Sequence, residues 1–438
     1  MQPHIRHETT KARKHGSTGS PQALALSLSK GDFVFSWLPV CVVAVATAAF
    51  ACSKQRPPNV NAPLRIEPMT LGAVEPSLAP QLTVTADRAL VSWIETQGRT
   101  SRLKFAERTP SGWSEPRTAA SGDDLFTSWA DVPSVFRLDA GTLVAQWLQT
   151  TDAAIDAYDV RLAFSKDQGR TWSAPTSPHH DGTKTQHGFA SLFPAPGRGF
   201  GIVWLDGRAI ETNAEKGNDN MSVRAATFDR DGKELGEALV DERACDCCPT
   251  AVAMTAAGPI AAFRDRSPDE VRDISVARRV NGQWTRPTTV HADGWQITAC
   301  PVNGPAISAR GRQVAVAWMT AKDDQGRAFA AFSSDAGATF DAPIRLDDAG
   351  SLGRVGIALV DDESAVASWI EFANQRAQLR IRRIDRSGAR GAAQTVAGVG
   401  AERTSGYPRL ARRGDELLLA WTETSDGRSK VQTAVAHW

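Results

Sequence analysis

An aromatic residue at the end of a short apolar stretch recurs seven times in this chain, at intervals of 51 to 59 residues. The seven aromatic residues are Trp93, Trp147, Trp204, Phe263, Trp318, Trp369 and Trp421. A second recurring element stands thirteen or fourteen residues before each of them, in most repeats a residue followed by Pro. A period of this length is typical of propeller blades. The repeats therefore predict an all-β propeller of four-stranded antiparallel blades, with seven blades by repeat count.

Two segments repeat the same eight-residue pattern, Ser-x-Asp-x-Gly-x-Thr followed by an aromatic residue. They are Ser165-Lys-Asp167-Gln-Gly169-Arg-Thr171-Trp172 and Ser333-Ser-Asp335-Ala-Gly337-Ala-Thr339-Phe340. The pattern suits a β-turn, because the carboxylate can accept backbone N–H bonds and Gly can adopt a positive φ. We expect the aromatic residue to pack between neighbouring sheets.

This pattern resembles the Asp-box of the sialidase-like (BNR-repeat) β-propellers, and the resemblance extends over residues 65–438 for the fold. Sialidases have six blades, so a six-bladed ring is the alternative to the count of seven. In sialidases the Asp-boxes lie away from the active site. The resemblance therefore implies that Asp167 and Asp335 are structural.

The last repeat ends at Trp438, before a fourth strand could form. A segment near Leu64–Leu71 can supply that strand and close the ring, which removes two exposed sheet edges. We therefore expect residues 64–438 to form one domain. Lys and Arg number 50 and Asp and Glu 49, so the near-neutral charge indicates no nucleic-acid partner. We expect a monomer.

The N-terminal 52 residues have the order of an export signal, preceded by an extension. An apolar run at residues 33–51 follows basic residues and ends in Ala51-Cys52. This order predicts a signal peptide with a lipobox, lipid attachment to Cys52 and a place in the bacterial cell envelope. Simple cleavage or a transmembrane anchor are the alternatives. Residues 53–63 are polar and contain three prolines, which favours a linker.

Antiparallel blades place the starts of the inner strands and the ends of the aromatic strands on one face, here called the channel mouth. In each repeat, the residue two positions before the recurring Pro or its equivalent is expected to line this mouth. These residues are Leu78, Asp131, Gly188, Cys247, Asn303, Arg354 and Gly406. The charged residues just after the aromatic strands are Glu95, Asp206, Arg208, Arg264, Asp265, Arg266, Glu371 and Glu423. Arginine suits carboxylates or phosphates and the acids could transfer protons, so we expect a glycan or another small anionic ligand. Mutual ion pairing around a solvated rim is the alternative.

The sialidase resemblance implies a tyrosine nucleophile activated by a glutamate, and Tyr407 with Glu423 occupies a matching late blade. Asp265 is a candidate acid or base, and Arg264, Arg266, Arg354, Asp131, Asp206 and Arg208 are candidate ligand-binding residues. The arginine expected in the first blade is replaced by Leu78-Ala79-Pro80, and Arg354 is the one arginine at that register. Two hypotheses follow, a sialidase-like glycoside hydrolase and a noncatalytic glycan-, protein- or metal-binding propeller. For Tyr407, packing beside Pro408 is the alternative.

Four cysteines fall at the mouth of adjacent repeats, Cys245, Cys247, Cys248 and Cys300. Exported proteins usually hold cysteines as disulfides, so we expect a bridge from Cys300 to the cluster and a possible vicinal pair at Cys247–Cys248. A soft-metal site is the alternative, because thiolates select Zn or Cu(I). His179, His180 and His187 could contribute to it, although their spacing matches no zinc signature. We expect no other cofactor.

Overall fold

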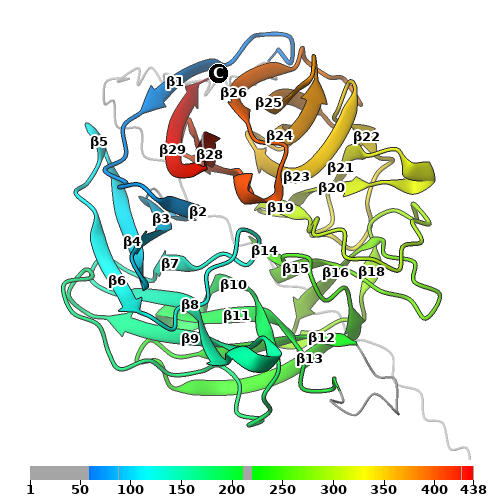
Figure 1. The fold of residues 1–438 in the computed structure, drawn as a ribbon. Helices are drawn as coiled ribbons and strands as arrows, with labels where there is room; N and C mark the ends of the chain where they lie inside the picture. Colours follow the sequence, from blue (N-terminus) through cyan, green and yellow to red (C-terminus); the bar gives the residue numbers. More distant parts are fainter. Residues whose placement is uncertain (1–58, 87, 211–219, 426, 438) are drawn as a thin grey trace, which may run out of the picture. The chain divides into compact units, whose positions relative to one another are not determined.

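The computed structural model describes residues 59–86, 88–210, 220–425 and 427–437. Seven antiparallel sheets surround a central axis, with β2, β7, β10, β14, β19, β23 and β27 innermost (Figure 1). The predicted all-β propeller with seven blades is thus confirmed, and the six-bladed alternative is wrong. The predicted signal segment, the lipobox and Cys52 lie outside the described residues.

Each blade is a short antiparallel meander. Blade 1 holds β2 (Ser77–Thr85), β3 (Arg88–Gln97), β4 (Thr100–Thr109), β5 (Gly112–Trp113) and β6 (Arg117–Gly122). Blade 2 holds β7 (Ser134–Arg137), β8 (Leu143–Asp152) and β9 (Ala157–Ser165). Its outer position carries a single bridge between Leu162 and Thr176. Blade 3 holds β10 (His187–Ala195), β11 (Gly199–Asp206), β12 (Met221–Phe228) and β13 (Glu234–Ala244).

The remaining blades repeat this order. Blade 4 holds β14 (Ala251–Thr255), β15 (Gly258–Arg264), β16 (Ile274–Val280), β17 (Gln283–Trp284) and β18 (Thr288–Thr289). Blade 5 holds β19 (Ala306–Arg310), β20 (Gln313–Thr320), β21 (Arg327–Ser333) and β22 (Ile344–Arg345). Blade 6 holds β23 (Gly350–Leu359), β24 (Ser364–Ala373), β25 (Arg376–Asp385) and β26 (Gln394–Val399). Blade 7 holds β27 (Arg409–Arg413), β28 (Glu416–Ser425), β29 (Arg428–His437) and β1 (Arg65–Met69).

The N-terminal strand closes the ring as the sequence predicts. β1 pairs antiparallel with β29 in a register that runs from Arg65 opposite His437 to Met69 opposite Thr433. Leu64, just before β1, is buried with the residues between blades 6 and 7. The ring is therefore held shut by hydrogen bonds between the two ends of the domain.

Alternating apolar residues on the strands bury one hydrophobic core between each pair of neighbouring blades. Trp93, Trp204, Trp318 and Trp369 are almost completely buried in these cores. Truncating a buried Trp to Ala typically costs about 3–5 kcal/mol. These recurring aromatic residues thus stabilise the contacts that hold the blades in a ring.

In three blades the buried indole N–H is capped by the carboxylate two residues later. Trp93 Nε1 donates to Glu95 at 2.9 Å, Trp204 Nε1 to Asp206 at 2.7 Å, and Trp369 Nε1 to Glu371 at 3.1 Å. A buried indole N–H needs such an acceptor. These three carboxylates therefore have a structural role at the end of the aromatic strand.

Both Asp-box turns adopt the expected geometry at the ends of β9 and β21. Asp335 Oδ1 accepts the N–H groups of Ala338 at 2.9 Å and Thr339 at 3.0 Å, and Asp167 makes the matching bonds. Gly169 and Gly337 have φ of 83° and 80°. Trp172 packs edge-on against Phe105 of blade 1, with ring centroids 6.0 Å apart, and Phe340 packs into the core between blades 4 and 5. The predicted packing of the aromatic residue between sheets is confirmed.

The helical segments among the described residues are short 3-10 turns. They are η1 (Ala153–Ile155), η2 (Pro196–Arg198), η3 (Lys322–Asp324) and η4 (Arg403–Ser405). None of the helices in the described part of the chain is long and apolar enough to cross a membrane. Residues 59–63, within the predicted linker, are included in the description, and Arg383 of blade 6 donates to the carbonyl of Asn59 at 3.4 Å.

Candidate functional site at the channel mouth

Residues 302–304, just before β19, form the hub of the channel mouth. The N–H of Asn303 donates to Cys248 Sγ at 3.3 Å, and its side-chain Oδ1 accepts the N–H of Arg354 at 2.8 Å. The carbonyl of Asn303 accepts Arg264 Nε at 2.8 Å. The structure therefore brings the predicted residues of blades 4, 5 and 6 together on one face, around a residue that the sequence placed only by its register.

The guanidinium group of Arg264 is buried and bonded to backbone carbonyls. Besides Asn303, it donates to the carbonyls of Met319 at 2.7 Å and Arg272 at 2.5 Å. It also lies over the ring of Trp295, 4.9 Å from the centroid. This arrangement ties blade 4 to blade 5 and leaves Arg264 1% exposed, so its contacts are those of a structural arginine.

Arg354 has a similar environment. It donates to Ser405 Oγ at 2.6 Å and to the carbonyls of Glu402 and Gly406 at 3.1 and 3.2 Å. Burial lowers the pKa of Arg354 from its usual range. Its guanidinium lies 5.2 Å from the centroid of Trp129, so the side chain braces blade 6 against η4.

Tyr407 is part of an apolar cluster on the axis, here called the central plug. The plug consists of Trp129, Ala130, Phe189, Cys247, Val302 and Tyr407. The Tyr407 hydroxyl donates to the carbonyl of Val302 at 2.5 Å and accepts the N–H of Gly304 at 3.4 Å. Burial is the main cause that raises the pKa of Tyr407 far above its usual range. These contacts match the packing interpretation of Tyr407.

The other candidates for catalysis do not meet Tyr407. Glu423 is exposed and accepts Gln432 Nε2 at 2.8 Å. Asp265 accepts the N–H of Arg266 at 2.7 Å and Ser275 Oγ at 2.9 Å, and burial raises its pKa. Arg266 forms a bidentate pair with Glu270, with a shortest distance of 2.7 Å. The tyrosine–glutamate pair that the resemblance implies is therefore not assembled in this structure.

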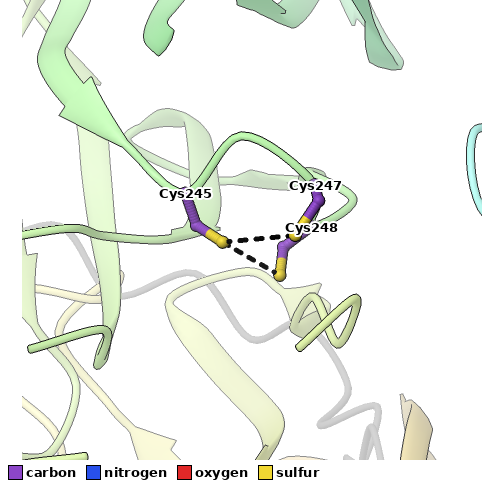
Figure 2. Close-up of side chains that lie close together, drawn as sticks. All are labelled: Cys245, Cys247 and Cys248. Carbon is purple, nitrogen blue, oxygen red and sulfur yellow. Dashed lines mark hydrogen bonds between the residues drawn. The ribbon is translucent and has the colours of Figure 1, made fainter. Parts of the chain in front are cut away.

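Three of the four cysteines form a compact cluster between β13 and β14, shown in Figure 2. Cys245 Sγ lies 3.4 Å from Cys248 Sγ and 3.7 Å from Cys247 Sγ. Cys245 and Cys248 are buried, and Cys247 is half-buried. We call Cys245, Cys247 and Cys248 the thiol cluster.

Positive charge and backbone donors surround the thiol cluster. Arg272 donates to Cys245 Sγ at 3.2 Å. The pKa of Cys245 is lowered by its hydrogen bonding with Cys247 and Cys248 and, more weakly, by the charge of Arg264. Burial is the main cause that raises the pKa of Cys248. One sulfur of the cluster is thus favoured as a thiolate.

The expected disulfides are not present, since all four cysteines of the described residues are free. Cys300 Sγ is directed to the carboxylate of Asp246, at 3.6 Å from Oδ2, instead of bonding to the cluster. It lies within 4.8 Å of Cys247 Sγ and is exposed. Cys300 is therefore an accessible thiol beside a buried cluster.

Asp131 is the most perturbed carboxyl group at the mouth. It is 2% exposed and its Oδ2 has no hydrogen-bond partner among the described residues. Burial raises its pKa to about 7, although the backbone of Phe189 opposes the shift. A Cβ on Gly188 would lie 2.1 Å from this Oδ2 and 2.8 Å from Tyr158, so the close packing depends on a glycine.

Asp206 and Arg208, the last predicted pair, belong to a second cluster at the mouth of blades 2 and 3. Arg208 donates to both carboxylate oxygens of Asp206 at 2.8 Å. Asp181 lies 3.3 Å from Arg208, and the buried His187 lies 3.8 Å from Asp206. Burial lowers the pKa of the neighbouring His179 to about 4. Both members of the predicted pair are thus paired with each other and surrounded by titratable groups.

A cavity of about 490 Å³ lies along the axis. It is bordered by the inner strands of all seven blades, with Tyr407 and Arg409 in its wall. None of the four cysteines borders it. The cysteine side chains of this face therefore lie around the central plug and not in the axial cavity.

Sequence reasoning missed Arg272, Asp246, Asp159 and Asp181. Arg272 and Asp181 stand in loops outside the repeated registers, so the period gives no signal for them. Asp159 is the third residue of β9, a strand outside the two repeated positions from which candidate residues were taken. The signal for Asp246 was its position inside the run Cys245-Asp-Cys-Cys248.

No family model and no curated protein matches the chain. Among solved structures it is similar to the Hadza microbial sialidase Hz136, with 14% identity and a TM-score of 0.43 over 70% of this chain and 65% of that one. It is also similar to the polysaccharide lyase Uly1, with 11% identity and a TM-score of 0.49 over 82% and 89% of the two chains. It is similar as well to an α-L-arabinanase of Penicillium chrysogenum, with 13% identity and a TM-score of 0.45 over 72% of this chain and 95% of that one. The chain spans about two thirds of the length of the sialidase.

The seven blades and the two Asp-box turns make the fold a sialidase-like β-propeller. Identities of this size concern only the fold, and the same propeller scaffold carries unrelated activities. The function is therefore argued from the side chains at the mouth.

Proposed function

We propose that the protein binds a soft metal ion, Cu(I) or Zn(II), through Cys245, Cys247 and Cys248 at the channel mouth. The observation that carries the proposal is the spacing of the sulfur atoms, 3.4 and 3.7 Å from Cys245 to the other two. Zinc–sulfur bonds of about 2.3 Å at tetrahedral angles place two sulfurs about 3.8 Å apart. The cluster has nearly this spacing, which is far longer than a disulfide bond of about 2.05 Å.

The surroundings of the cluster suit bound thiolates. The N–H of Asn303 and the guanidinium of Arg272 point at two of the sulfurs, at 3.3 and 3.2 Å. Donors around ligand sulfurs hold them in place and offset their charge. Soft thiolates select Cu(I) or Zn over hard cations such as Mg²⁺, so calcium and magnesium do not fit this site.

Cys300 gives the site an accessible fourth thiol. It is exposed on the segment before β19, close to Cys247 and Asp246. A ligand in that position can complete a four-sulfur zinc site or receive Cu(I) from solvent and pass it to the buried cluster. A zinc site should need Cys300, whereas a trigonal copper site should need only the thiol cluster.

The proposal includes export and lipid attachment at Cys52, which place the protein in the bacterial cell envelope. Thiols there face oxidation, and a bound metal ion would protect the cluster against disulfide formation. The mass of the mature N-terminus tests the anchor. A diacylated Cys52 as the first residue is expected, and an unmodified N-terminus further along would contradict it.

One observation favours a second candidate function, cleavage of a glycan at the same mouth. Burial raises the pKa of Asp131 to about 7, which suits a general acid near neutral pH. Fluorogenic sialosides and a glycan array test this candidate with the purified chain. Turnover that is lost in Asp131→Asn would support it, and no turnover of any substrate would remove it.

The metal proposal is tested by titrating the reduced chain with Cu(I) or Zn(II) against a chromophoric chelator under anaerobic conditions. We expect one sulfur-bound ion per chain, and we expect Cys245→Ser or Cys248→Ser to abolish competition with the chelator for Cu(I) and to remove the sulfur-bound Zn(II). Cys300→Ser should weaken zinc more than copper.

Thr250→Ala is the matched control. It removes a bond from Thr250 Oγ1 to the carbonyl of Phe189 at 2.7 Å on the same segment but removes no sulfur. Its metal affinity should equal that of the parent chain. Undiminished Cu(I) binding after the loss of both Cys245 and Cys248, or no Cu(I) binding by the reduced parent chain, would contradict the proposal.

A further inference from the structure

Two buried histidines lie face to face at the mouth of blades 2 and 3, outside the thiol cluster. His187, the first residue of β10, is 0% exposed, and His179 in the preceding connection is 6% exposed. Their rings are 3.8 Å apart and 7° from parallel. The two imidazoles therefore present matching edges to their surroundings.

One edge faces Asp159 at the start of β9. Asp159 Oδ1 lies 3.5 Å from His187 Nδ1 and 3.8 Å from His179 Nε2. Both of these nitrogens are buried and have no hydrogen-bond partner among the described residues. Leaving a buried polar atom unpaired typically costs about 1–3 kcal/mol, so the pair of nitrogens aimed at one carboxylate needs an explanation.

The opposite edge faces Asp181. Its Oδ2 lies 3.3 Å from His187 Nε2 and 3.6 Å from His179 Nδ1. Asp181 is itself held by the N–H of Thr183 at 3.0 Å and lies 3.3 Å from Arg208. The positive charge of Arg208 makes this edge unsuitable for a cation, whereas no Lys or Arg among the described residues forms an ion pair with Asp159.

We propose that His179 Nε2, His187 Nδ1 and Asp159 Oδ1 bind one divalent transition-metal ion, for which Zn²⁺ is the probe. The three atoms lie within 4.8 Å of one another. Zinc bonds of about 2.0–2.1 Å to nitrogen and oxygen place tetrahedral ligands about 3.3–3.4 Å apart. Because the two rings are 7° from parallel, both must tilt for their nitrogen lone pairs to converge on one ion beside Asp159.

Asp181 completes the arrangement as a positioning residue. A ligand histidine commonly donates its other N–H to a carboxylate, which fixes the tautomer and the ring orientation. Asp181 faces that second nitrogen on both rings. Asp206 is not assigned as a ligand, because its carboxylate is already bonded to Trp204 and Arg208. Two imidazoles and one carboxylate leave an open position for water or a ligand.

The site does not rest on the proposed thiolate function, and the experiment keeps the two apart. The chain with Cys245, Cys247, Cys248 and Cys300 all replaced by Ser is titrated with Zn²⁺. One ion per chain is expected. X-ray absorption should show nitrogen and oxygen at about 2.0–2.1 Å and no sulfur at about 2.3 Å.

Variants assign the ligands. Asp181→Asn should weaken Zn²⁺ binding by about 10–100-fold, and His179→Ala or Asp159→Asn by more. His180→Ala is the matched control, because His180 is exposed and pairs with Glu234 at 3.0 Å. Its affinity should be unchanged.

A second measurement covers the case in which the four-serine chain does not fold. Co(II) added to the parent chain should then give a sulfur charge-transfer band from the thiol cluster and ligand-field absorption from both sites. His179→Ala should keep the sulfur band and lose one bound Co(II) together with the ligand-field absorption of that ion. Absence of stoichiometric Zn²⁺ binding in a folded four-serine chain, or an equal loss in His180→Ala and His179→Ala, would overturn the proposal.

Discussion

Two aspartates on opposite faces of the ring show how differently this fold uses the same side chain. Asp335, in an Asp-box turn, accepts hydrogen bonds from Ser333, Ala338 and Thr339. Burial alone would raise the pKa of Asp335, but these hydrogen bonds outweigh burial and lower the pKa to about 2. Asp131, at the mouth, has an unpartnered buried oxygen, and burial raises its pKa to about 7. One carboxyl group is fully satisfied and the other is not.

The contrast extends to the residues around each aspartate. The Asp335 carboxylate accepts its hydrogen bonds from Ser333, Ala338 and Thr339, which belong to the same eight consecutive residues. The mouth combines segments far apart in the sequence and leaves imidazole nitrogens and a carboxylate oxygen unpaired among the described residues. Locally satisfied groups stabilise a fold, whereas unsatisfied buried groups are typical of functional sites. This difference is the reason that both proposed metal sites are sought at the mouth.

The largest effect is expected where the contacts are least local. Deletion of residues 60–72 removes β1, which pairs in blade 7 with β29 from the other end of the domain's sequence. The deletion exposes two sheet edges, so the chain should lose cooperative unfolding and aggregate. Light scattering and thermal melting measure this.

Arg65→Ala serves as the control for the deletion, because Arg65 is an exposed residue of β1 that pairs with Glu67. It keeps the backbone pairing and should melt like the parent chain. A deletion variant that remains soluble with unchanged melting would show that β1 does not hold the ring closed.

Asp131→Asn should change the pH dependence of stability. The pKa of Asp131 is raised from 3.8 to about 7 by burial, so the folded state keeps a proton that the unfolded state releases between pH 4 and 7. Stability therefore falls as pH rises through this window. The Asn variant should be more stable than the parent at pH 8 by on the order of 2–4 kcal/mol, and nearly equal at pH 4.

Denaturant unfolding at the two pH values measures this difference. If Asp131→Asn were less stable than the parent chain at pH 8, the proposed difference between Asp131 and the Asp-box aspartates would be wrong. That outcome would mean that the Asp131 carboxylate is stabilised by its surroundings.

Asp335→Ala should change the pH dependence of the free energy of unfolding in the opposite direction and by a smaller amount. The depressed pKa of about 2 means that the carboxylate contributes stability above pH 4, and this contribution is lost as pH falls from 4 to 2. Because the Asp335 carboxyl group is only half-buried, we expect a loss of only about 1–2 kcal/mol at pH 7. Asp362→Ala, an exposed acid 3.7 Å from Arg310, is the control. Equal costs at pH 7 and pH 2.5 would contradict this account.

The same distinction explains what the sequence could predict. The blade count, the closing strand and the Asp-boxes follow from patterns within one repeat or one turn. The common face of Arg264, Arg354 and the cysteines also follows, because antiparallel strands fix it. The partners of these side chains do not follow, since the contacts of Asn303 with three blades depend on how the blades pack.

Tyr407 illustrates the limit of the resemblance. Its position in the last repeat matches a sialidase nucleophile, yet its hydroxyl meets the carbonyl of Val302, a residue more than a hundred positions away in the sequence. No local pattern encodes that contact. His179 and His187 were named from the sequence, but their stacking was not predicted, because Asp159 and Asp181 reach them from a separate strand and loop.

The most direct test of the central claim is X-ray absorption on the reduced full chain loaded with one equivalent of Cu(I). The account predicts a first shell of sulfur alone, with about three sulfurs from Cys245, Cys247 and Cys248. Cys245→Ser should lose that shell, and Thr250→Ala should retain it. A first shell of nitrogen and oxygen in the parent chain, with the sulfur atoms unchanged in its absorption spectrum, would contradict the assignment of the thiol cluster as the metal site.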